Sequence, residues 1–510
     1  MKRTEVIKTK FGKIQGYQDR SLKIFKGIPY AKPPIGNLRF KPPSNIHPWD
    51  GILKVAEYGP YAPQGFTLLE DSFGKFEKQN ENNCLTLNIW TPEPEDEKRP
   101  VMVYIHGGSF IFGGGADIWY GVDGSELSRS GNVVVVTFNY RLGAFGFLYL
   151  PDISTNIGIL DQVAALKWVK DNIENFGGDP NNITIFGESA GASSVLTLVS
   201  IPLAKGLFHK AIMQSAPTFD TKPTIRSTTS LFKELGVKFG DLDALSELKA
   251  KKIIKAQNKI ISDWSMNLED EIMDFRPSID GIIIPKHPIE AIKSGCGKDI
   301  DILIGNNKDE IKLWTAPYQK WQEKDSQGLK SMLLSRLAKF GNGELVANEN
   351  FCFKLIEAYK DDSRSRPIDI FDQIDTDFTF RIPAIRVCET HYPHNSSTYS
   401  YLFTWSSPAL NGRYGSCHVV EIPFVFGTIG KTGVEWFYGV GKEAELLSKR
   451  MMKTWLSFAY NGNPNNELIP EWKGYDIKDR ITMFMGKDFK IVNAPLEEQR
   501  ILWDDTYLNF

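Results

Sequence analysis

Residues 183–194 read Ile183-Thr-Ile-Phe-Gly-Glu-Ser-Ala-Gly-Ala-Ser-Ser194 and contain the most informative local pattern of the chain. Ile183 and Ile185 alternate with polar residues as in a strand, and the residues from Ala190 onward are good helix formers. Between the two, small residues flank Ser189 on both sides. A sharp turn from a strand into a helix strains its central residue and leaves room only for small neighbours. The stretch therefore predicts a strand, a tight turn and a helix, with the Ser189 hydroxyl exposed at the carboxyl edge of a sheet.

This Gly-x-Ser-x-Gly pattern is the nucleophile elbow of α/β-hydrolases. Five residues alone leave an alternative open, because a glycine-rich turn whose serine caps a helix has the same composition. The remainder of the chain has to distinguish the two.

Apolar runs and amphipathic segments alternate around the elbow, and after Leu207 the pattern thins. Continuous apolar runs are typical of strands covered on both faces, and apolar residues at helical spacing predict helices. The alternation predicts a doubly wound, mostly parallel sheet with helices on both faces, the α/β-hydrolase fold. The predicted elements are strands over 22–28, 85–90, 101–105, 132–138, 301–305 and 398–405, and helices over 160–176 and 451–460. We expect one domain over 1–510, in which helical insertions at about 220–275 and 315–395 form the walls of an active-site gorge.

Composition and charge exclude several classes of protein. A net charge of −2 gives no basic footprint for nucleic acid, and no apolar stretch approaches the 18 or so residues that span a membrane. The charged start lacks the apolar run of a signal peptide. The five cysteines are odd in number and contain no Cys-x-x-Cys pair, which argues against a disulfide framework and a zinc site. We expect a soluble cytoplasmic protein without metal, cofactor, nucleic acid or membrane partner, with a monomer favoured.

A serine needs a base to take its proton and an acid to orient that base. In this fold the acid and then the histidine follow the serine, each at the end of a core strand. Asp309 and Glu310 follow the strand at 301–305, and either could be the acid. Of the seven histidines, His418 is the one that follows the strand at 398–405. The alternative for His418 is a loop histidine near a core strand.

His106-Gly107-Gly108-Ser109 resembles the oxyanion-hole loop of esterases. Glycines let backbone amides approach a ligand closely, so two amides of this loop and that of Ala190 would face a developing oxyanion. The alternative is a simple glycine turn after a strand.

Over nearly its full length the chain resembles the type-B carboxylesterases, which include bacterial p-nitrobenzyl esterases, mammalian carboxylesterases and cholinesterases. Among these branches, the bacterial one is the most similar to this chain in length and in the general character of its sequence. The blocks that carry the resemblance are Lys26-Gly-Ile-Pro-Tyr-Ala31, Asn139-Tyr-Arg141, Gly143-Ala-Phe-Gly-Phe147, Phe176-Gly-Gly-Asp-Pro-Asn181, the elbow, and His418 with Glu421-Ile-Pro-Phe-Val-Phe426.

The resemblance implies the role of each site residue. Ser189 would be the nucleophile, Glu310 the acid and His418 the general base. Gly108, Ser109 and Ala190 would donate the oxyanion-hole amides. Arg141 and Asp161 would form a structural ion pair beneath the sheet.

Three departures from the family pattern carry expectations of their own. The usual Ser-Glu-Asp-Cys-Leu block is Glu81-Asn-Asn-Cys-Leu85, so the partner that the family pattern gives Arg39 is missing. Cys84 should be unpaired, because Ala62 stands where secreted members have the second cysteine. Gly74, near Phe73 and Phe76, stands where cholinesterases have a tryptophan that binds quaternary ammonium, which argues against choline esters as substrates.

The predicted function is hydrolysis of small to medium neutral or apolar carboxylic esters through an acyl-enzyme. Phe110, Phe275 and Trp314 are candidates for the substrate pocket, although aromatic residues at such places are as often plain core. Two alternatives remain: a non-catalytic binding protein on the same fold, and another acyl hydrolase such as an amidase, thioesterase or lactonase.

Overall fold

The computed structural model describes residues 2–65, 78–93, 97–116, 121–151, 155–217, 225–265, 275–340, 348–361, 366–431 and 433–504. Phe73, Gly74 and Phe76, on which the expectation about choline esters depends, lie outside the described residues, as do parts of both predicted insertions.

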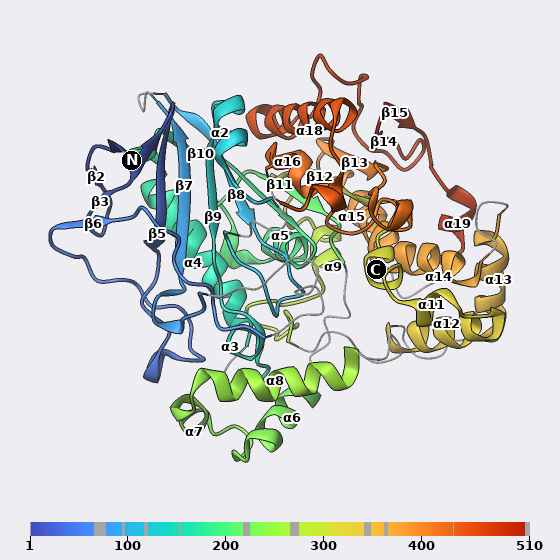
Figure 1. Ribbon diagram of the computed structural model, residues 1–510, viewed down its shortest axis with the longest axis horizontal. Coiled ribbons are helices and arrows are strands. Elements are labelled where there is room, and N and C mark those ends of the chain that lie inside the picture. Colours follow the sequence, from blue (N-terminus) through green and yellow to red (C-terminus); the bar gives the residue numbers. More distant parts are fainter. Residues whose placement is uncertain are drawn as a thin grey trace.

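A sheet of twelve described strands runs through the molecule (Figure 1). The six neighbouring pairs from β9 to β14 are parallel, and the pairs at both ends of the sheet are antiparallel. In sheet order the strands are β1 (Lys2–Arg3), β4 (Tyr17–Asp19), β5 (Leu22–Pro29), β7 (Thr86–Pro92), β9 (Val134–Phe138), β8 (Arg99–Ile105), β10 (Gly178–Glu188), β11 (Lys210–Gln214), β12 (Asp301–Asn307), β13 (Thr398–Phe403), β14 (Thr482–Met485) and β15 (Phe489–Val492). A small separate sheet contains β2 (Ile7–Lys8), β3 (Lys13–Gln15) and β6 (Ile52–Lys54). This is the α/β-hydrolase fold.

Successive side chains of a strand point to opposite sides of the sheet. A continuous run of apolar residues therefore places apolar side chains on both faces, and both faces are buried. In β8, Val101, Val103 and Ile105 belong to a first apolar core, and Met102 and Tyr104 belong to a second core on the other face.

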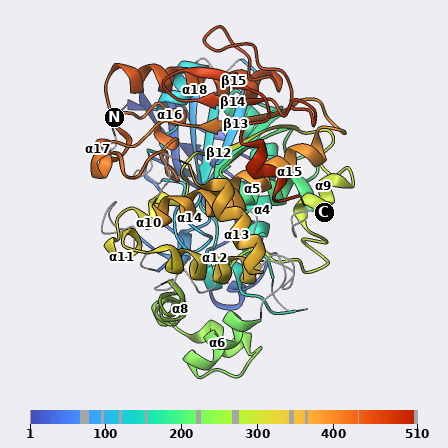
Figure 2. The same cartoon turned by 90° about the vertical axis from the view of Figure 1, so that its right-hand side faces the viewer.

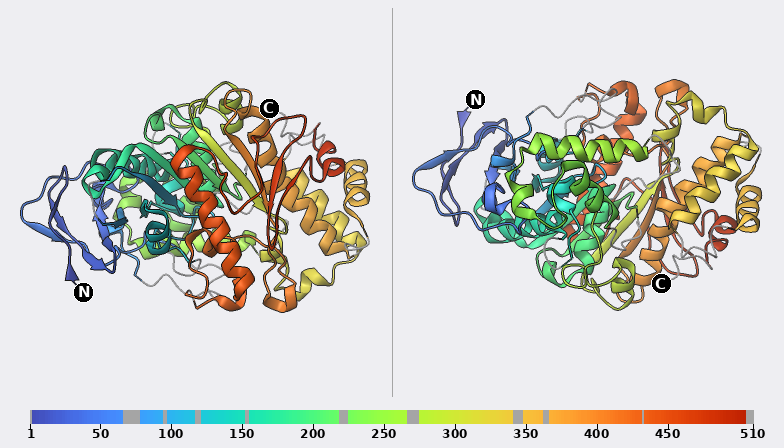
Figure 3. Two further views of the ribbon diagram at one scale, coloured as in Figure 1. Left: turned by 90° about the horizontal axis from the view of Figure 1, so that it is seen from above. Right: turned by 90° about the horizontal axis from the view of Figure 1, so that it is seen from below.

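Helices cover each face (Figure 3). The first core includes side chains of α3 (Gly143–Phe147), α4 (Ile157–Asn172), α5 (Ala190–Ser200), α9 (Pro288–Lys293) and α15 (Ile382–His391). The second core includes side chains of α2 (Ser125–Gly131), α10 (Lys312–Thr315), α16 (Ile422–Phe426), α17 (Glu435–Tyr438) and α18 (Lys442–Asn461). None of the described helices combines the length and apolarity needed to cross a membrane.

Two helical segments lie outside this sandwich, at the positions predicted for the insertions (Figures 1 and 2). The first contains α6 (Arg226–Leu235), α7 (Leu242–Glu247) and α8 (Ala250–Ser265). The second contains α11 (Gln319–Gln322), α12 (Ser326–Phe340), α13 (Glu349–Tyr359), α14 (Pro367–Thr376) and a π-helix at Asp377–Arg381, and α19 (Glu497–Ile501) packs against α13. The second segment has an apolar cluster of its own, which includes Phe371 and Phe380 and which Ile311, the residue after Glu310, also joins. That these segments form gorge walls in one domain stays a prediction.

Some elements differ from the sequence-based expectation. The sequence pattern predicts no strand between Leu207 and residue 301, but β11 lies there, between the elbow strand and β12. It has five residues with Lys210 and Gln214 at its ends, so its apolar run is too short to be recognised from the pattern. Strands β14 and β15 are not predicted either, and the helix expected at 451–460 begins earlier, at Lys442.

Candidate active site

Strand β10 ends at Glu188 and α5 begins at Ala190, which leaves Ser189 alone in the turn. Ser189 has φ 57° and ψ −124°, outside the usual regions for a non-glycine residue, and its N–H donates to the Gln214 carbonyl at 2.9 Å. A Cβ at Gly187 would lie 2.6 Å from the Ile105 carbonyl oxygen, and a Cβ at Gly191 would overlap the same atom. The two glycines are therefore what allows the elbow to pack against the end of β8.

Glu310 and His418 are joined directly. Glu310 Oε2 lies 2.6 Å from His418 Nδ1, and the His418 N–H donates to the Glu310 carbonyl at 3.2 Å. The other carboxylate oxygen, Oε1, accepts from the Asn307 N–H at 2.6 Å. Asp309 points elsewhere: it accepts from the Ser416 N–H and lies 3.0 Å from Lys312 Nζ. Of the two acids that the sequence leaves open, Glu310 is the one in contact with the imidazole.

The second imidazole nitrogen faces the elbow. His418 Nε2 lies 3.1 Å from Oε1 of Glu188, the residue that precedes Ser189. Among the described residues, the Ser189 hydroxyl makes no hydrogen bond to His418. Catalytic hydrogen bonds often form fully only when substrate is bound, so this geometry is compatible with a serine–histidine pair. The sequence analysis does not select Glu188 as a site residue, although its position directly before Ser189 in the elbow could have indicated that it lies in the site.

Several carboxylates influence the charge of His418. Burial lowers the pKa of His418, but Glu188, Glu310 and Glu421 together outweigh burial and raise it to about 9. Glu421 is itself fully buried and accepts hydrogen bonds from Gln214 Nε2 at 3.0 Å and Asn307 Nδ2 at 2.7 Å. The site therefore stabilises a positively charged imidazole.

The glycine loop after β8 lies against the elbow. Three consecutive residues, Gly108, Ser109 and Phe110, have positive φ values of 98°, 52° and 61°. A Cβ at Gly107 would lie 2.7 Å from the Glu188 carbonyl oxygen and 3.2 Å from Ser189 Cβ. Within the described part of the chain the N–H groups of Gly108 and Ser109 make no hydrogen bond, and that of Ala190 lies in the first turn of α5, where helix amides lack an intrahelical partner.

Two aromatic rings flank His418. The ring centroid of Trp314 lies 5.1 Å from the imidazole centroid, and that of Phe380 lies 5.0 Å from it. Phe380 belongs to the π-helix and is not predicted from the sequence, because no periodic pattern indicates a π-helix. Of the other two pocket candidates, Phe110 packs on Phe147 and Phe275 belongs to the first core, and both are fully buried. Their part in a pocket stays a prediction.

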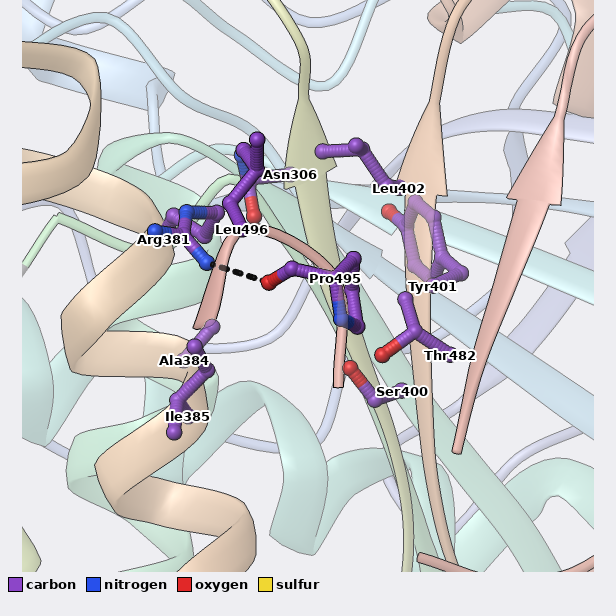
Figure 4. A pocket seen from close by; sticks show the side chains of 10 residues that line it. All are labelled: Asn306, Arg381, Ala384, Ile385, Ser400, Tyr401, Leu402, Thr482, Pro495 and Leu496. Atoms are coloured by element: carbon purple, nitrogen blue, oxygen red, sulfur yellow. Dashed lines mark hydrogen bonds between the residues drawn. The ribbon is translucent and has the colours of Figure 1, made fainter. Parts of the chain in front are cut away.

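A small cavity lies between β12, β13, β14 and the start of α15, with Asn306 and Tyr401 in its lining (Figure 4). Its volume is about 20 Å³, and Arg381 Nη1 donates to the Pro495 carbonyl across one side at 3.2 Å. A cavity of this size holds one water molecule, so it is too small for an ester. No group of three or more His, Cys, Asp or Glu side chains in the described ranges is arranged to hold a metal ion.

Arg141 and Arg39 each form an ion pair with a carboxylate. Arg141 and Asp161 form the predicted buried pair, with Nε and Nη2 donating to the two carboxylate oxygens at 2.8 and 2.7 Å. The partner that the family pattern gives Arg39 is missing from this block, but Arg39 is still paired, because its guanidinium binds both carboxylate oxygens of Glu81. Glu81 lies three residues before Cys84 and reaches Arg39 from the short 3₁₀ turn that it begins. All five cysteines, Cys84 included, are free.

The chain resembles known proteins along almost all of its length. The sequence model of the carboxylesterase family matches residues 3–502. The para-nitrobenzyl esterase of Bacillus subtilis (strain 168) is 36% identical over 504 residues, which cover 97% of this chain and 98% of that protein. A solved structure of a PNB esterase has a TM-score of 0.86 at 34% identity and covers 98% of this chain and 99% of its own. The Geobacillus stearothermophilus carboxylesterase has a TM-score of 0.86 at 33% identity, covering 98% and 100%.

Fold and sequence together therefore place this chain among the α/β-hydrolases, with esterases as its relatives. The chain belongs to the carboxylesterase family, and it is a carboxylic-ester hydrolase.

Proposed function

We propose that this chain hydrolyses small to medium neutral or apolar carboxylic esters through an acyl-enzyme on Ser189. The observation that carries the proposal is the position of His418, which is bound to Glu310 on one side and faces the Ser189 elbow through its other nitrogen. A histidine that an acid orients on one side and that faces a serine on the other can take the proton of that serine when substrate is bound.

In the proposed first step, Ser189 Oγ attacks the ester carbonyl and His418 Nε2 accepts its proton. Glu310 keeps the imidazole in the required tautomer and stabilises its positive charge. The amides of Gly108, Ser109 and Ala190 donate to the tetrahedral oxyanion, the place where preorganised donors act most strongly. His418 then gives its proton to the departing alcohol.

In the proposed second step, water attacks the acyl carbon while His418 takes a proton from the water. The bond from the acyl carbon to Ser189 Oγ then breaks, His418 returns the proton to Ser189, and the carboxylic acid leaves. Every step uses side chains and amides of this chain, so the proposal requires neither a metal nor an organic cofactor.

The half-buried Trp314, beside His418, is the pocket residue best supported by distance. Five free cysteines support a reducing compartment such as the cytoplasm. We further propose that the protein is a monomer.

Hydrolysis of p-nitrophenyl esters from C2 to C12 tests this function. We expect wild type to cleave the short members and Ser189→Ala to lose on the order of 10⁴-fold or more in kcat. Ser200→Ala is the matched control, because Ser200 lies at the far end of α5 and its hydroxyl donates to the Thr197 carbonyl. A wild type inert on every chain length would favour the binding-protein alternative. Faster turnover of matched amides, thioesters or lactones would favour another acyl hydrolase.

A further inference from the structure

Val419 directly follows His418, and its backbone has a φ of 67°. A β-branched residue in this left-handed region is a genuine outlier, because its Cβ and branched substituents crowd the backbone. The side chain is only 5% exposed and belongs to the second core. The surrounding structure therefore holds Val419 in a conformation that valine itself disfavours.

The strained residue is part of the turn that carries His418. The Val420 N–H donates to the Cys417 carbonyl at 3.4 Å, which makes His418 the second and Val419 the third residue of a four-residue turn. A type II turn requires positive φ at its third position and therefore favours glycine there. The Ile422 N–H donates to the Val419 carbonyl at 3.3 Å, so the same residue also connects the turn to the start of α16.

The position of the imidazole depends on this turn. His418 is attached to Glu310 at two points, through its N–H and through Nδ1. A change of Val419 to negative φ would rotate the peptide between His418 and Val419 relative to the buried valine side chain and α16. That rotation would move the imidazole away from Glu310 and from the elbow.

We infer that Val419 is a positioning residue, whose left-handed backbone, held by the burial of its side chain, sets the His418 imidazole between Glu310 and Glu188. The inference rests on the proposed function, in which His418 is the general base.

Two substitutions separate the role of the backbone from that of the side chain. Glycine adopts positive φ without penalty, so Val419→Gly keeps the turn although it loses the side chain. Alanine retains the Cβ that disfavours positive φ but loses most of the apolar surface that holds valine in place, so in Val419→Ala the turn relaxes. At an ordinary buried position the order is the opposite, because glycine is the more destabilising substitution. Val135 is such a position: it is fully buried in β9, in the same core, and is not among the residues with positive φ.

The experiment measures kcat and KM on a short p-nitrophenyl ester for wild type and for the glycine and alanine variants at 419 and 135. Active sites are counted by stoichiometric reaction with a fluorophosphonate, so that kcat refers to folded sites. We expect Val419→Ala to lose roughly 10- to 100-fold in kcat with little change in KM, as a small misplacement of a catalytic group does. We expect Val419→Gly to keep a clearly higher kcat than Val419→Ala and to melt at a higher temperature. At 135 the alanine variant should melt above the glycine variant, with kcat per active site like that of wild type.

A wild-type kcat per active site in Val419→Ala would overturn the inference, because packing alone would then explain the valine. A lower kcat in Val419→Gly than in Val419→Ala would also overturn it, because the left-handed backbone would not be what positions His418. If Val419→Ala yields no folded protein, Val419→Ser replaces it, since serine is small and keeps a Cβ. Failure of the proposed function is seen separately, as a wild type that neither cleaves the ester nor reacts with the fluorophosphonate.

Discussion

His418 Nδ1 lies 2.6 Å from Glu310 Oε2, although 108 residues separate the two in the sequence. The contact follows from the sheet, because β12 and β13 are parallel neighbours and Glu310 and His418 both follow their carboxyl ends. With β10 in the same parallel set, the elbow reaches the same edge of the sheet.

The identity of the acid can be tested with neighbouring residues. Glu310→Gln should reduce kcat by about 10⁴-fold, as loss of the orienting acid does in serine hydrolases, because the amide stabilises neither the tautomer nor the charged imidazole. Asp309→Asn is the control: Asp309 contacts Ser416 and Lys312, so its loss should lower the melting temperature more than kcat. If Asp309→Asn abolished hydrolysis and Glu310→Gln did not, the assignment would be reversed.

The pH dependence follows from the raised pKa of His418. A general base must be neutral, and His418 has a pKa of about 9, so kcat/KM should rise with pH to a midpoint well above the ordinary 6.5. Glu188→Gln removes the leading contribution that raises this pKa and should move the midpoint to lower pH. Glu443→Gln, an exposed acid at the start of α18, is the charge control and should leave the profile in place. If the pH midpoint of kcat/KM were unchanged in Glu188→Gln, Glu188 would not be what raises the pKa of His418.

The same pKa has a consequence for stability. A histidine with a raised pKa in the folded state binds its proton more tightly there than in the unfolded chain. Its contribution is fully present below pH 6.5 and is lost as pH rises to about 9. The urea midpoint of wild type should therefore fall between these pH values more than that of His418→Gln. If the urea midpoints of the two proteins changed equally with pH, the prediction would be wrong.

Arg141 and Asp161 allow a prediction about folding alone. Asp161→Asn leaves a buried guanidinium without its charge partner and should cost about 3–5 kcal/mol in the free energy of unfolding, measured in urea. Asp171→Asn breaks the exposed pair with Lys10 and should cost less than about 1 kcal/mol. If both variants lost a similar amount of free energy of unfolding, burial would not be the reason why the Arg141–Asp161 pair contributes to stability.

The elbow glycines can be tested by adding one methyl group. Gly191→Ala places a Cβ on backbone atoms of Ile105 and His106, which cannot move aside as a flexible side chain can, so little folded and active enzyme should form. Gly328→Ala, in the first turn of α12, places a Cβ whose nearest neighbours are atoms of the Lys324 and Asp325 side chains, and it should be neutral or stabilising. Expression, melting temperature and ester hydrolysis of both variants measure the difference, and normal activity in Gly191→Ala would refute the steric argument.

Local patterns predict the parts of the site that depend on near neighbours in sequence. The Gly187–Gly191 elbow is recognisable because a strand, a tight turn and a helix each leave a short-range pattern. The order of the strands along the chain also indicates His418, because this histidine follows the strand that comes after the two candidate acids, Asp309 and Glu310. The choice between Asp309 and Glu310, however, depends on where two adjacent side chains point, and local sequence does not determine that.

Contacts between distant segments account for what the sequence does not predict. Glu81 pairs with Arg39 from a block that differs from the family pattern, and Phe380 reaches His418 through a π-helix in the second insertion. The contact of Glu188 with His418 Nε2 likewise depends on the meeting of β10 with the turn after β13. Each is a tertiary contact without a local sequence signal.

Trapping the acyl-enzyme shows whether Ser189 is the nucleophile. Wild type is mixed with p-nitrophenyl acetate, quenched in acid during steady-state turnover, digested and mapped by mass spectrometry. We expect a single acetyl group on Ser189, with a p-nitrophenolate burst that matches the number of active sites. An acetyl group on another residue, or turnover without any acetylated Ser189 and without a burst, would contradict it.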